Sequence, residues 1–386
     1  MPKNNTYELK VYFGASGLAI IKPKWNALLK IVTNRMYSHS PDWYGAYLDH
    51  LADLPEKVIF FAVYNNSELV AVIPLENKLH NFSGFKFWVL CLPLHYHFGL
   101  KDFVVSERES SELIFSFFLK ELKFLPDIQW DLVFLQGVLE ESVAGKSIPA
   151  KLSPLQFRSG FSFCDVLPVK SYEEVSAEFS KNFRGALRKA RNKLDKHQHV
   201  EFKTSRSKDK LLELFTKFLD VESSGWKGVH GTKSAIKLNE KLKAFYLQNV
   251  IGYSNRNEAE ISILEVDDVA IAAQLAFVID DVVYLLKIGF DEKYSKLAPG
   301  NMLLEYKLKE YHRKGDVKRI NLITDAKWHR SWQPEVLPTV NFYVCNRSFG
   351  GIKFALLYSV KTYLSDNKKI TSIVQNFFRI KRKLLC

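Results

Sequence analysis

One order of elements occurs twice in this sequence, about 200 residues apart, and limits the fold more than any other feature. Each copy has the alternation of a β-hairpin, then a strand, a helix and a final strand. The hairpins turn at Asn65-Asn66-Ser67 and at Asp267-Asp268. The order predicts a degenerate duplication of one α/β unit, with a boundary around 145–169. The expected strands are 58–64, 69–75, 87–94 and 130–137, then 261–266, 270–278, 282–290 and 318–324; the expected helices are 25–35, 43–51, 110–124 and 301–314.

The composition agrees with a folded protein of two or three domains, since a domain has about 100–200 residues and the chain has 386. Hydrophobic residues make up 47% and charged residues 25%, which excludes long disorder, collagen and coiled-coil rods. The sequence predicts no membrane-spanning helix, because no stretch approaches ~18 apolar residues. The N-terminus lacks the apolar core of a signal peptide, so we expect a cytoplasmic protein.

The four cysteines and the net charge constrain the ligands. None of the cysteines has C-x-x-C spacing, so buried thiols are expected in place of a zinc site or a disulfide framework. The net charge of +13 favours an anionic partner. Nucleic acid, a phosphorylated substrate, CoA and an anionic membrane surface all fit, and charge alone does not choose among them.

Residues 172–196 have the pattern of one long basic helix. Phe183, Leu187, Ala190 and Leu194 recur at helical spacing. A neighbouring face carries Lys181, Arg184, Arg188 and Arg191. This face is either simply solvated or a cradle for phosphate, which arginine can bind with two hydrogen bonds. RNA binding is weakly supported, because no RNA-binding motif accompanies the charge.

A second candidate for anion binding follows the predicted strand 282–290. A loop leads to Pro299-Gly300, where a helix is expected to begin. The free N–H groups of Gly300, Asn301 and Met302 would point at an anion, with the helix dipole in support. Ordinary helix capping gives the same pattern. The loop matches neither a P-loop nor a dinucleotide-binding fingerprint.

Several stretches together resemble a known family. They are Ser180-Lys181-Asn182-Phe183-Arg184, Glu222-x-x-x-Trp226-Lys227-Gly228, Phe245-Tyr246, Ile271-Ala272, and Lys287-x-x-Phe290-Asp291-x-x-Tyr294-x-x-x-x-Pro299-Gly300-x-x-Leu303, with Asp325 and Trp332 downstream. In this order they resemble the CelD/BcsL-like acetyltransferases of the GNAT superfamily, which are associated with polysaccharide biosynthesis. The resemblance covers about residues 20–360 and is strongest over 164–332.

The resemblance implies an α/β fold of two tandem GNAT-like units, with mixed, mainly antiparallel sheets flanked by helices. Residues 1–160 would form a degenerate unit, and 161–386 the acyltransferase unit with a C-terminal basic helix. The implied activity is acyl transfer, in particular acetyl transfer, from acyl-CoA to an amino group of a sugar or sugar-nucleotide used in surface polysaccharide. Two alternatives stay open: a Fem-type transferase that uses aminoacyl-tRNA, and a non-catalytic accessory protein of a polysaccharide synthase.

The resemblance also implies roles for single residues. Glu222, Asp325 and His329 are candidate bases, and Tyr294 could protonate the leaving thiolate. His329 stands where the family often has a lysine. Residues expected to bind acyl-CoA are Lys287, Pro299, Gly300, Asn301 and Met302. Residues expected to bind the substrate are Lys181, Arg184, Arg188, Trp226, Lys227, Asp291 and Trp332.

Each of these residues also has an ordinary structural interpretation. Glu222 could pair with Lys227, Asp325 could cap a helix, His329 could lie on the surface, and the aromatic residues could be core. We expect no metal, because no carboxylate or cysteine is spaced to complete a site with the pairs His95/His97 or His197/His199.

The C-terminal segment 368–386 combines six basic residues with several apolar ones and has no acidic residue. A basic amphipathic helix of this kind can lie at an anionic membrane surface. The sequence therefore suggests peripheral contact with the inner membrane or with a polysaccharide synthase. The alternative is that the apolar face packs on the protein. A nucleic-acid partner is not expected.

Overall fold

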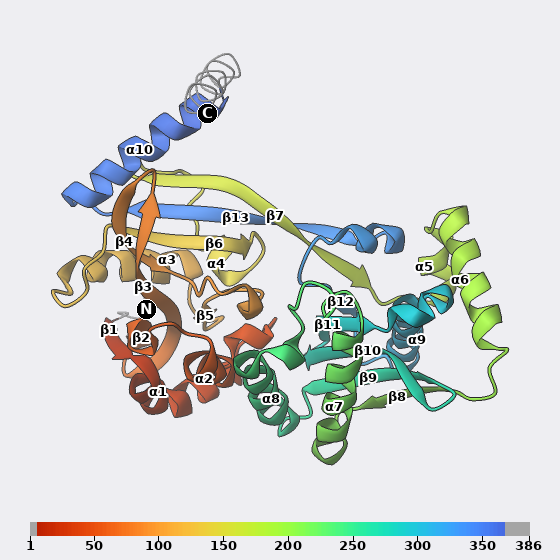
Figure 1. Ribbon diagram of the computed structural model, residues 1–386. Coiled ribbons are helices and arrows are strands. Elements are labelled where there is room, and N and C mark those ends of the chain that lie inside the picture. The colour runs from red at the N-terminus through yellow and green to blue at the C-terminus, as the bar shows by residue number, and fades with distance from the viewer. Residues whose placement is uncertain (1–5, 367–386) are drawn as a thin grey trace.

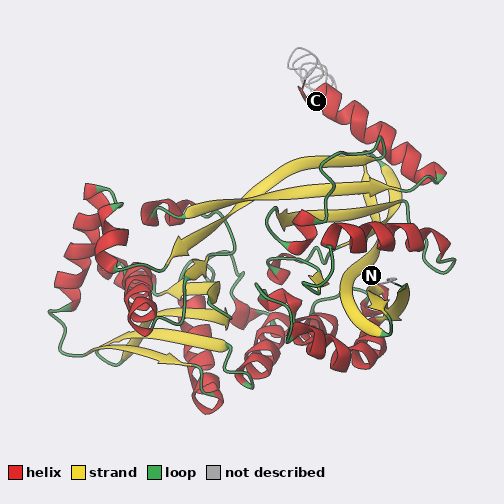
Figure 2. Cartoon of the chain, turned by 180° about the vertical axis from the view of Figure 1, so that it is seen from behind, coloured by secondary structure: helices red, strands yellow, loops and turns green. Residues whose placement is uncertain are grey.

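The computed structural model describes residues 6–366, and a single twisted sheet of 13 strands runs through both halves of the molecule (Figures 1 and 2). The N-terminal half contributes β1 (Tyr7–Phe13), β2 (Val58–Asn65), β3 (Glu68–Phe82), β4 (Phe85–Cys91) and β6 (Leu132–Leu139), with β5 (Val104–Val105) beside β3. The middle of the sheet is β13 (Glu335–Cys345) and β7 (Gln156–Pro168). The C-terminal half adds β12 (Arg319–Asn321), β11 (Val282–Phe290), β10 (Val269–Ile279), β9 (Ala259–Val266) and β8 (Val200–Ser205).

The predicted duplication is visible in the strand order. Each half has four antiparallel strands, β1 to β4 or β8 to β11, followed by one parallel pair, β4 with β6 or β11 with β12. The long strand β13 then pairs with β6, β7 pairs with β12, and β13 and β7 pair with each other. The last strand within residues 6–366 therefore lies against the N-terminal half. A division at 160/161 stays a prediction, and β7 runs through this point.

The helices cover both faces of the sheet and separate the core into clusters. The longer helices are α1 (Gly14–Leu29), α2 (Pro41–His50), α3 (Ser111–Glu121), α6 (Lys181–Leu194), α7 (Lys208–Ser224), α8 (Glu240–Ser254), α9 (Pro299–Lys314) and α10 (Phe349–Asp366); α4 (Val143–Lys146) and α5 (Tyr172–Ala177) are short. One core cluster contains residues of α1, α2, α7 and α8, so it joins the two halves. A second lies under α6 and α9.

Aromatic side chains make the contact between the halves. The ring of Trp43 in α2 lies 4.9 Å from Phe245 in α8 and 5.9 Å from Phe277 in β10. The Tyr253 hydroxyl donates to the carbonyl of Tyr37 at 2.5 Å. Since these residues are all buried, the contact holds α2 and α8 in a fixed relation.

Some sequence expectations are confirmed and others are wrong. Both hairpins and the strand 282–290 form as predicted. The single helix over 172–196 is wrong, because α5 and α6 are separate. The break lies at Ser180, whose hydroxyl accepts from the Phe183 N–H at 3.2 Å and so begins a new helix. The expected helix 25–35 is instead the end of α1, which stops at Leu29, and the strands β7 and β13 were not predicted.

Other expectations concern cysteines, histidines and membranes. Cys91, Cys164 and Cys345 are buried free thiols, as expected. His97 does not lie on a strand, because 96–98 form a short 3₁₀ turn. Within residues 6–366, no helix has the length and apolar character needed to cross a membrane. The basic segment 368–386 lies outside the described residues.

Gly289 in β11 tests how closely α7 packs on the sheet. A Cβ added there would lie 2.7 Å from the Glu222 Cα, so backbone would have to move. We expect Gly289→Ala to lower the free energy of unfolding by about 1–3 kcal/mol. The control is Gly160→Ala in β7, where nothing lies within 4 Å. Thermal unfolding measures both, and equal stability of the two variants would contradict this packing.

Candidate functional site

The sheet opens between β11 and β12. These parallel strands pair only from Val282–Arg319 to Tyr284–Asn321, so the edge of β11 beyond Leu285 has no β12 partner. The chain leaves the sheet at Ile323, which has a φ of 66°, a left-handed conformation that a β-branched residue rarely adopts. Two hydrogen bonds hold the turn: Ile323 N–H to Asn321 Oδ1 at 2.8 Å and Thr324 N–H to the Leu322 carbonyl at 2.7 Å.

A β-bulge in β11 decides which side chains face the opening. Leu275 of β10 is opposite Lys287, whereas the next residue, Ala276, is opposite Leu285, so Leu286 is the extra residue. Beyond the bulge, Lys287 shares the sheet face of Leu275, which belongs to the α7/α8 cluster. The alternate residues Ile288 and Phe290 face α9, where both come within 3.7 Å of a Cβ built on Gly300. The bulge therefore turns Lys287 toward the junction of the two halves.

The ammonium group of Lys287 lies among aromatic rings from both halves. Its Nζ is 5.6 Å from the ring centre of Tyr96 and 5.8 Å from that of Tyr246. Burial lowers the pKa of Lys287 to about 8; the charge of Lys227 adds to this effect and Glu222 opposes it. Lys287 therefore changes its charge close to neutral pH.

His97 joins the halves beside Lys287. Its Nδ1 is 2.8 Å from the Tyr246 hydroxyl, which belongs to α8. Burial and then the charge of Lys287 lower the pKa of His97 to about 2, so the imidazole is neutral at physiological pH. Its Nε2 is buried and has no hydrogen-bond partner among residues 6–366. A buried ring nitrogen without a partner is unusual, and it leaves one position for a ligand group.

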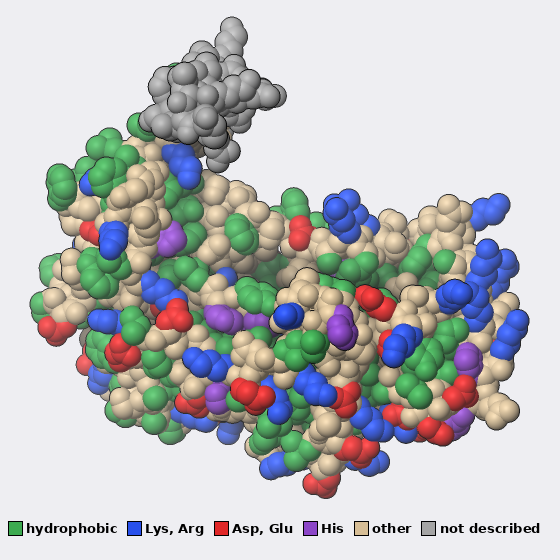
Figure 3. Space-filling view, viewed as in Figure 1, with side chains coloured by type: hydrophobic (Ala, Val, Ile, Leu, Met, Phe, Trp, Pro, Cys, Tyr) green, Lys and Arg blue, Asp and Glu red, His purple; other side chains and the backbone are tan. Residues whose placement is uncertain are grey.

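Tyr96 and His97 line a cleft of about 470 Å³ between the halves, and Lys287 lies behind this lining, with its Nζ 5.6 Å from the ring centre of Tyr96. The lining comes from two segments of the N-terminal half and one of the C-terminal half. The lining residues are His50, Leu51, Ala52, Asp53, His95, Tyr96, His97, Lys233, Ser234, Ala235, Asn239, Lys241 and Leu242. Figure 3 shows histidine side chains gathered near the middle of this face of the molecule. The cleft is largely polar, so it suits a polar molecule.

Glu222 and Lys227 lie together next to this region, as the ion-pair interpretation expected. The Lys227 Nζ is 3.1 Å from Glu222 Oε1, and the other oxygen accepts the Ile236 N–H at 2.9 Å. Lys227 also donates to the Ile288 carbonyl at 3.3 Å, on β11. Glu222 is thus fully engaged, and its pair with Lys227 positions the loop that carries Trp226, a side chain 56% exposed.

Asp325 and His329 follow β12 and belong to a separate group. His329 is buried, and its Nδ1 is 2.8 Å from Asp165 Oδ2 on β7. Burial lowers the pKa of His329 although Asp165 raises it. Asp325 is exposed. In the described part of the chain, no contact joins Glu222 to either residue, so the structure does not bring the three candidate bases together.

The start of α9 fits part of the anion-site prediction. Pro299 is the first helical residue, and the described residues offer no acceptor to the N–H groups of Gly300 and Asn301. The Met302 N–H is not free, because it donates to the Ala298 carbonyl at 3.0 Å. Asn301 Oδ1 accepts from Trp332 Nε1 at 3.2 Å. An anion would therefore meet two N–H groups.

The remaining predicted residues have mainly structural contacts. Lys181, Arg184 and Arg188 are exposed on α6, and the Arg184 guanidinium donates to the carbonyls of Ser176 and Ala177 at the end of α5. Asp291 caps the 3₁₀ turn 292–297 by accepting the Lys293 N–H at 3.0 Å. Tyr294 packs partly buried on the α9 cluster. Trp332 is buried against Phe179 and Phe183, so it is not exposed for stacking.

Sequence reasoning missed Tyr96, His97 and Tyr246 as members of the site. The segment His95-Tyr96-His97 was noted only as a possible histidine pair, and Phe245-Tyr246 only as part of the family pattern. Nothing in the sequence indicates that residues about 150 positions apart meet, although the duplication predicts some contact between the halves.

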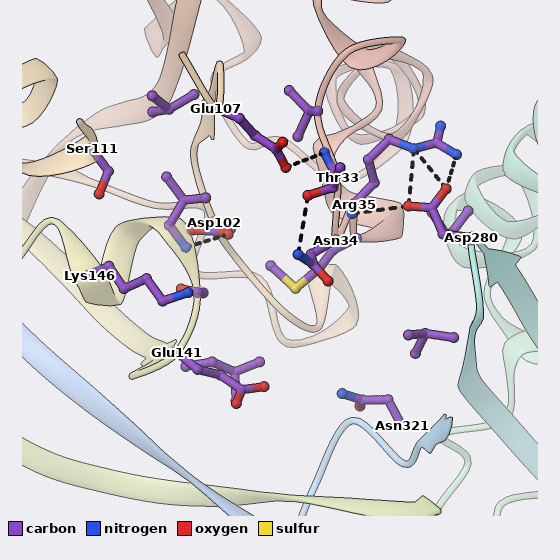
Figure 4. A pocket seen from close by; sticks show the side chains of 18 of the residues that line it. Thr33, Asn34, Arg35, Asp102, Glu107, Ser111, Glu141, Lys146, Asp280 and Asn321 are labelled. Carbon is purple, nitrogen blue, oxygen red and sulfur yellow. Dashed lines mark hydrogen bonds and ion pairs between the residues drawn. The ribbon is translucent and has the colours of Figure 1, made fainter. Parts of the chain in front are cut away.

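A second cavity, of about 400 Å³, lies between the halves at the beginning of β11 (Figure 4). Several of its charged groups already have partners. Arg35 binds Asp280, with Nη2 and Oδ1 2.5 Å apart, and Glu107 accepts the Thr33 N–H at 3.0 Å. The cavity is lined by Val282 and Tyr284, before the bulge. The first cleft is the better candidate site, because Tyr96 in its lining contacts Lys287.

No three of the His, Cys, Asp and Glu side chains within 6–366 are grouped so that they could hold a metal ion.

Comparison with known proteins identifies the class. Residues 181–330 match the model of the acetyltransferase (GNAT) domain. The chain therefore contains a GNAT acetyltransferase domain and is a GNAT-type transferase. The predicted fold class, two tandem GNAT-like units, is confirmed. No curated protein matches the sequence. Membership in the CelD/BcsL-like subfamily stays a prediction.

Three solved structures are among those similar to this chain. The crystal structure of FemX has a TM-score of 0.55 and 11% identity, over 84% of this chain and 96% of FemX. L-PGS from Bacillus licheniformis has a TM-score of 0.49 and 13% identity, over 87% of this chain and 96% of L-PGS. A tandem GNAT protein from the clavulanic acid biosynthesis pathway has a TM-score of 0.45 and 8% identity, over 88% of this chain and 100% of that protein. The likeness to FemX shows a shared fold.

His329 offers a test that separates support from catalysis. We expect His329→Gln to lower the free energy of unfolding by about 1–3 kcal/mol, because the buried Asp165 loses its partner. The pH dependence of the reaction should keep its shape. His230→Gln, at an exposed position, is the control. A change in the shape of the pH profile would instead make His329 a participant in proton transfer.

Proposed function

We propose that this protein transfers an acyl group, in particular acetyl, from acyl-CoA to an amino group of a sugar or sugar-nucleotide used in surface polysaccharide, in the cytoplasm. One observation carries the proposal. Lys287, with a pKa of about 8, lies at the end of β11 that β12 does not pair, beside Tyr96 of the cleft lining and on the strand face opposite to the one next to α9. Donor and acceptor sites would thus meet at one strand.

The donor would bind on the α9 side. The N–H groups of Gly300 and Asn301 and the dipole of α9 suit the pyrophosphate of CoA. The unpaired edge of β11 offers backbone groups to the rest of the donor, and Ile288 and Phe290 give this side an apolar wall. These features support acyl-CoA as the co-substrate.

The acceptor would enter the cleft between the halves. The cleft is polar, and two aromatic side chains are exposed around it: Tyr96 on its wall and Trp226 on the loop that leads to Ser234 and Ala235. Exposed aromatic rings beside polar groups suit a sugar, whose faces are apolar and whose edges are polar. This combination supports a sugar acceptor.

Lys287 would act first as the general base and then as the general acid. Its neutral amine accepts a proton from the acceptor ammonium, and the freed amine attacks the thioester carbonyl. The carbon–sulfur bond then breaks, the ammonium of Lys287 gives its proton to the thiolate, and the second proton of the attacking nitrogen leaves to water as the amide forms. A base with a pKa near the working pH contributes roughly 10²-fold to 10⁴-fold. His97, fixed by Tyr246, would position the acceptor through its Nε2. Glu222 is paired with Lys227, and His329 with Asp165, so Lys287 is the better candidate base.

The Fem-type alternative would use aminoacyl-tRNA as the donor. The fold shared with FemX and the exposed cations of α6 favour it. The two donors are distinguished by incubating the protein with radiolabelled acetyl-CoA or with charged tRNA and an amino-sugar nucleotide. Label transfer from acetyl-CoA alone supports our proposal. Transfer from tRNA alone supports the alternative, and no binding of either donor supports an accessory role.

Replacement of Gly300 tests the donor site. Gly300→Val should raise the Kd for acetyl-CoA at least tenfold, because the side chain blocks the approach to the N–H groups. A Cβ at this position makes only ordinary contacts, at 3.7 Å, so the fold should persist. Gly185→Val in α6, where nothing lies within 4 Å, is the control. Calorimetry measures both, and an unchanged affinity in Gly300→Val would contradict the proposed site.

Replacement of Lys287 tests the proton transfer. With a pKa of about 8, the neutral base gains population as the pH rises, so kcat should increase up to about pH 8 and then level off. Lys287→Met should lower kcat by at least 100-fold and leave the Kd for acetyl-CoA within about threefold. Lys241→Met, in a lysine that lines the cleft, is the control. If Lys287→Met keeps the wild-type pH profile, Lys287 is not the base.

A further inference from the structure

The last described helix, α10, is anchored to the sheet by one face. Phe354 and Tyr358 pack on the β3–β4 hairpin, where the ring of Phe354 lies 4.8 Å from Phe82 and 5.4 Å from Phe87. Ala355 is buried in the same cluster. The helix runs along the outside of the sheet, and its final turns project beyond it (Figures 1 and 2).

The opposite face of α10 is also apolar, and it is exposed. Five large side chains form this face, each between 45% and 85% exposed: Phe349, Ile352, Leu356, Val360 and Tyr363. Their spacing of three or four residues places them in one row along the helix, about 21 Å long at 1.5 Å per residue. We call this row the outer stripe. Leu356 is two positions from both Phe354 and Tyr358, so the stripe points away from the sheet.

Cations flank the outer stripe. Lys353 lies 3.5 Å from the ring centre of Phe85, and Lys361 lies 4.8 Å from that of Phe82. From Arg347 to Cys386 the sequence has nine basic residues and one acidic residue, Asp366. Figure 3 shows hydrophobic side chains with basic ones beside them over α10. An exposed apolar row of this length marks a contact surface.

The charges around the outer stripe indicate which kind of partner binds it. A second copy would bring Lys353 and Lys361 toward the same lysines of its partner. The sequence that follows α10 is also basic, with six cations between 368 and 386. An anionic surface would instead be attracted. We propose that the outer stripe docks α10 into the interface of an anionic lipid bilayer, with the lysines at the level of the headgroups.

The proposal rests on α10 and is independent of the chemistry in the cleft. It holds the enzyme at a membrane by a described helix, and so does not require the segment 368–386 to insert. Activity with a soluble acceptor should therefore be unaffected when the stripe is changed, whereas failure of the proposed acyl transfer would leave vesicle binding intact.

The experiment is vesicle co-sedimentation of the full chain. The vesicles contain either phosphatidylcholine alone or phosphatidylcholine with about one third phosphatidylglycerol. We expect binding to the anionic vesicles only. The double variant Leu356→Glu, Val360→Glu should bind at least tenfold more weakly. The matched control, Thr362→Glu with Ser365→Glu, adds the same charge to exposed positions of α10 outside the stripe and should bind within about threefold of the wild type.

A second measurement reports insertion directly. In Leu356→Trp, the added indole should make the fluorescence emission shift to the blue with anionic vesicles, relative to the unmodified chain. Failure of the wild type to bind anionic vesicles would overturn the proposal, and so would equal losses in the stripe and control variants. Dimerisation of the wild type in sedimentation velocity that the stripe variant abolishes, without vesicle binding, would assign the stripe to a second copy and also overturn it.

Discussion

The contact between α2 and α8 fixes the candidate site, because it holds together two halves that each supply part of the cleft. Trp43 packs on Phe245, and two polar contacts lie at the edge of the same interface. His50 Nε2 is 2.6 Å from Gln248 Oε1, and Arg256 Nη1 is 2.6 Å from Asp42 Oδ2. Tyr246, which follows Phe245 in α8, forms the hydrogen bond with His97. A shift of α8 against the N-terminal half would break that hydrogen bond.

The duplication explains why so much of the fold was predictable. Hairpins and buried strands such as 282–290 have local patterns of alternation and turn residues, so the sequence predicts them without knowledge of their partners. The long strands β7 and β13 lack this local evidence. Pro338 interrupts the pattern of β13 and Gly160 that of β7, and each strand is stabilised by pairing with a segment far away in the sequence. The division of 172–196 at Ser180 was readable, since serine is a strong helix N-cap.

The site was less predictable, because its geometry depends on one irregularity and on contacts between the halves. Lys287 was identified from a family pattern, yet its environment follows from the bulge at Leu286. Without that extra residue, strict alternation would place Lys287 on the α9 face. The lack of a side chain at Gly289 then lets α7 approach β11 closely and bring Glu222 beside Lys287. No local pattern predicts such a bulge, and none predicts that Tyr96 will cover the lysine from the other half.

Burial is the main cause of the lowered pKa of Lys287, and the charges of Lys227 and Glu222 act on this pKa in opposite directions. Lys227 alone would disfavour a second ammonium, but its ion pair with Glu222 places a negative charge at 3.1 Å from its own Nζ. Burial is the largest cause of the lowered pKa. Part of that burial comes from Tyr96, which belongs to the N-terminal half. In the proposed mechanism, the N-terminal half would need no active site of its own, because it contributes Tyr96 to the environment that buries the lysine of the other half.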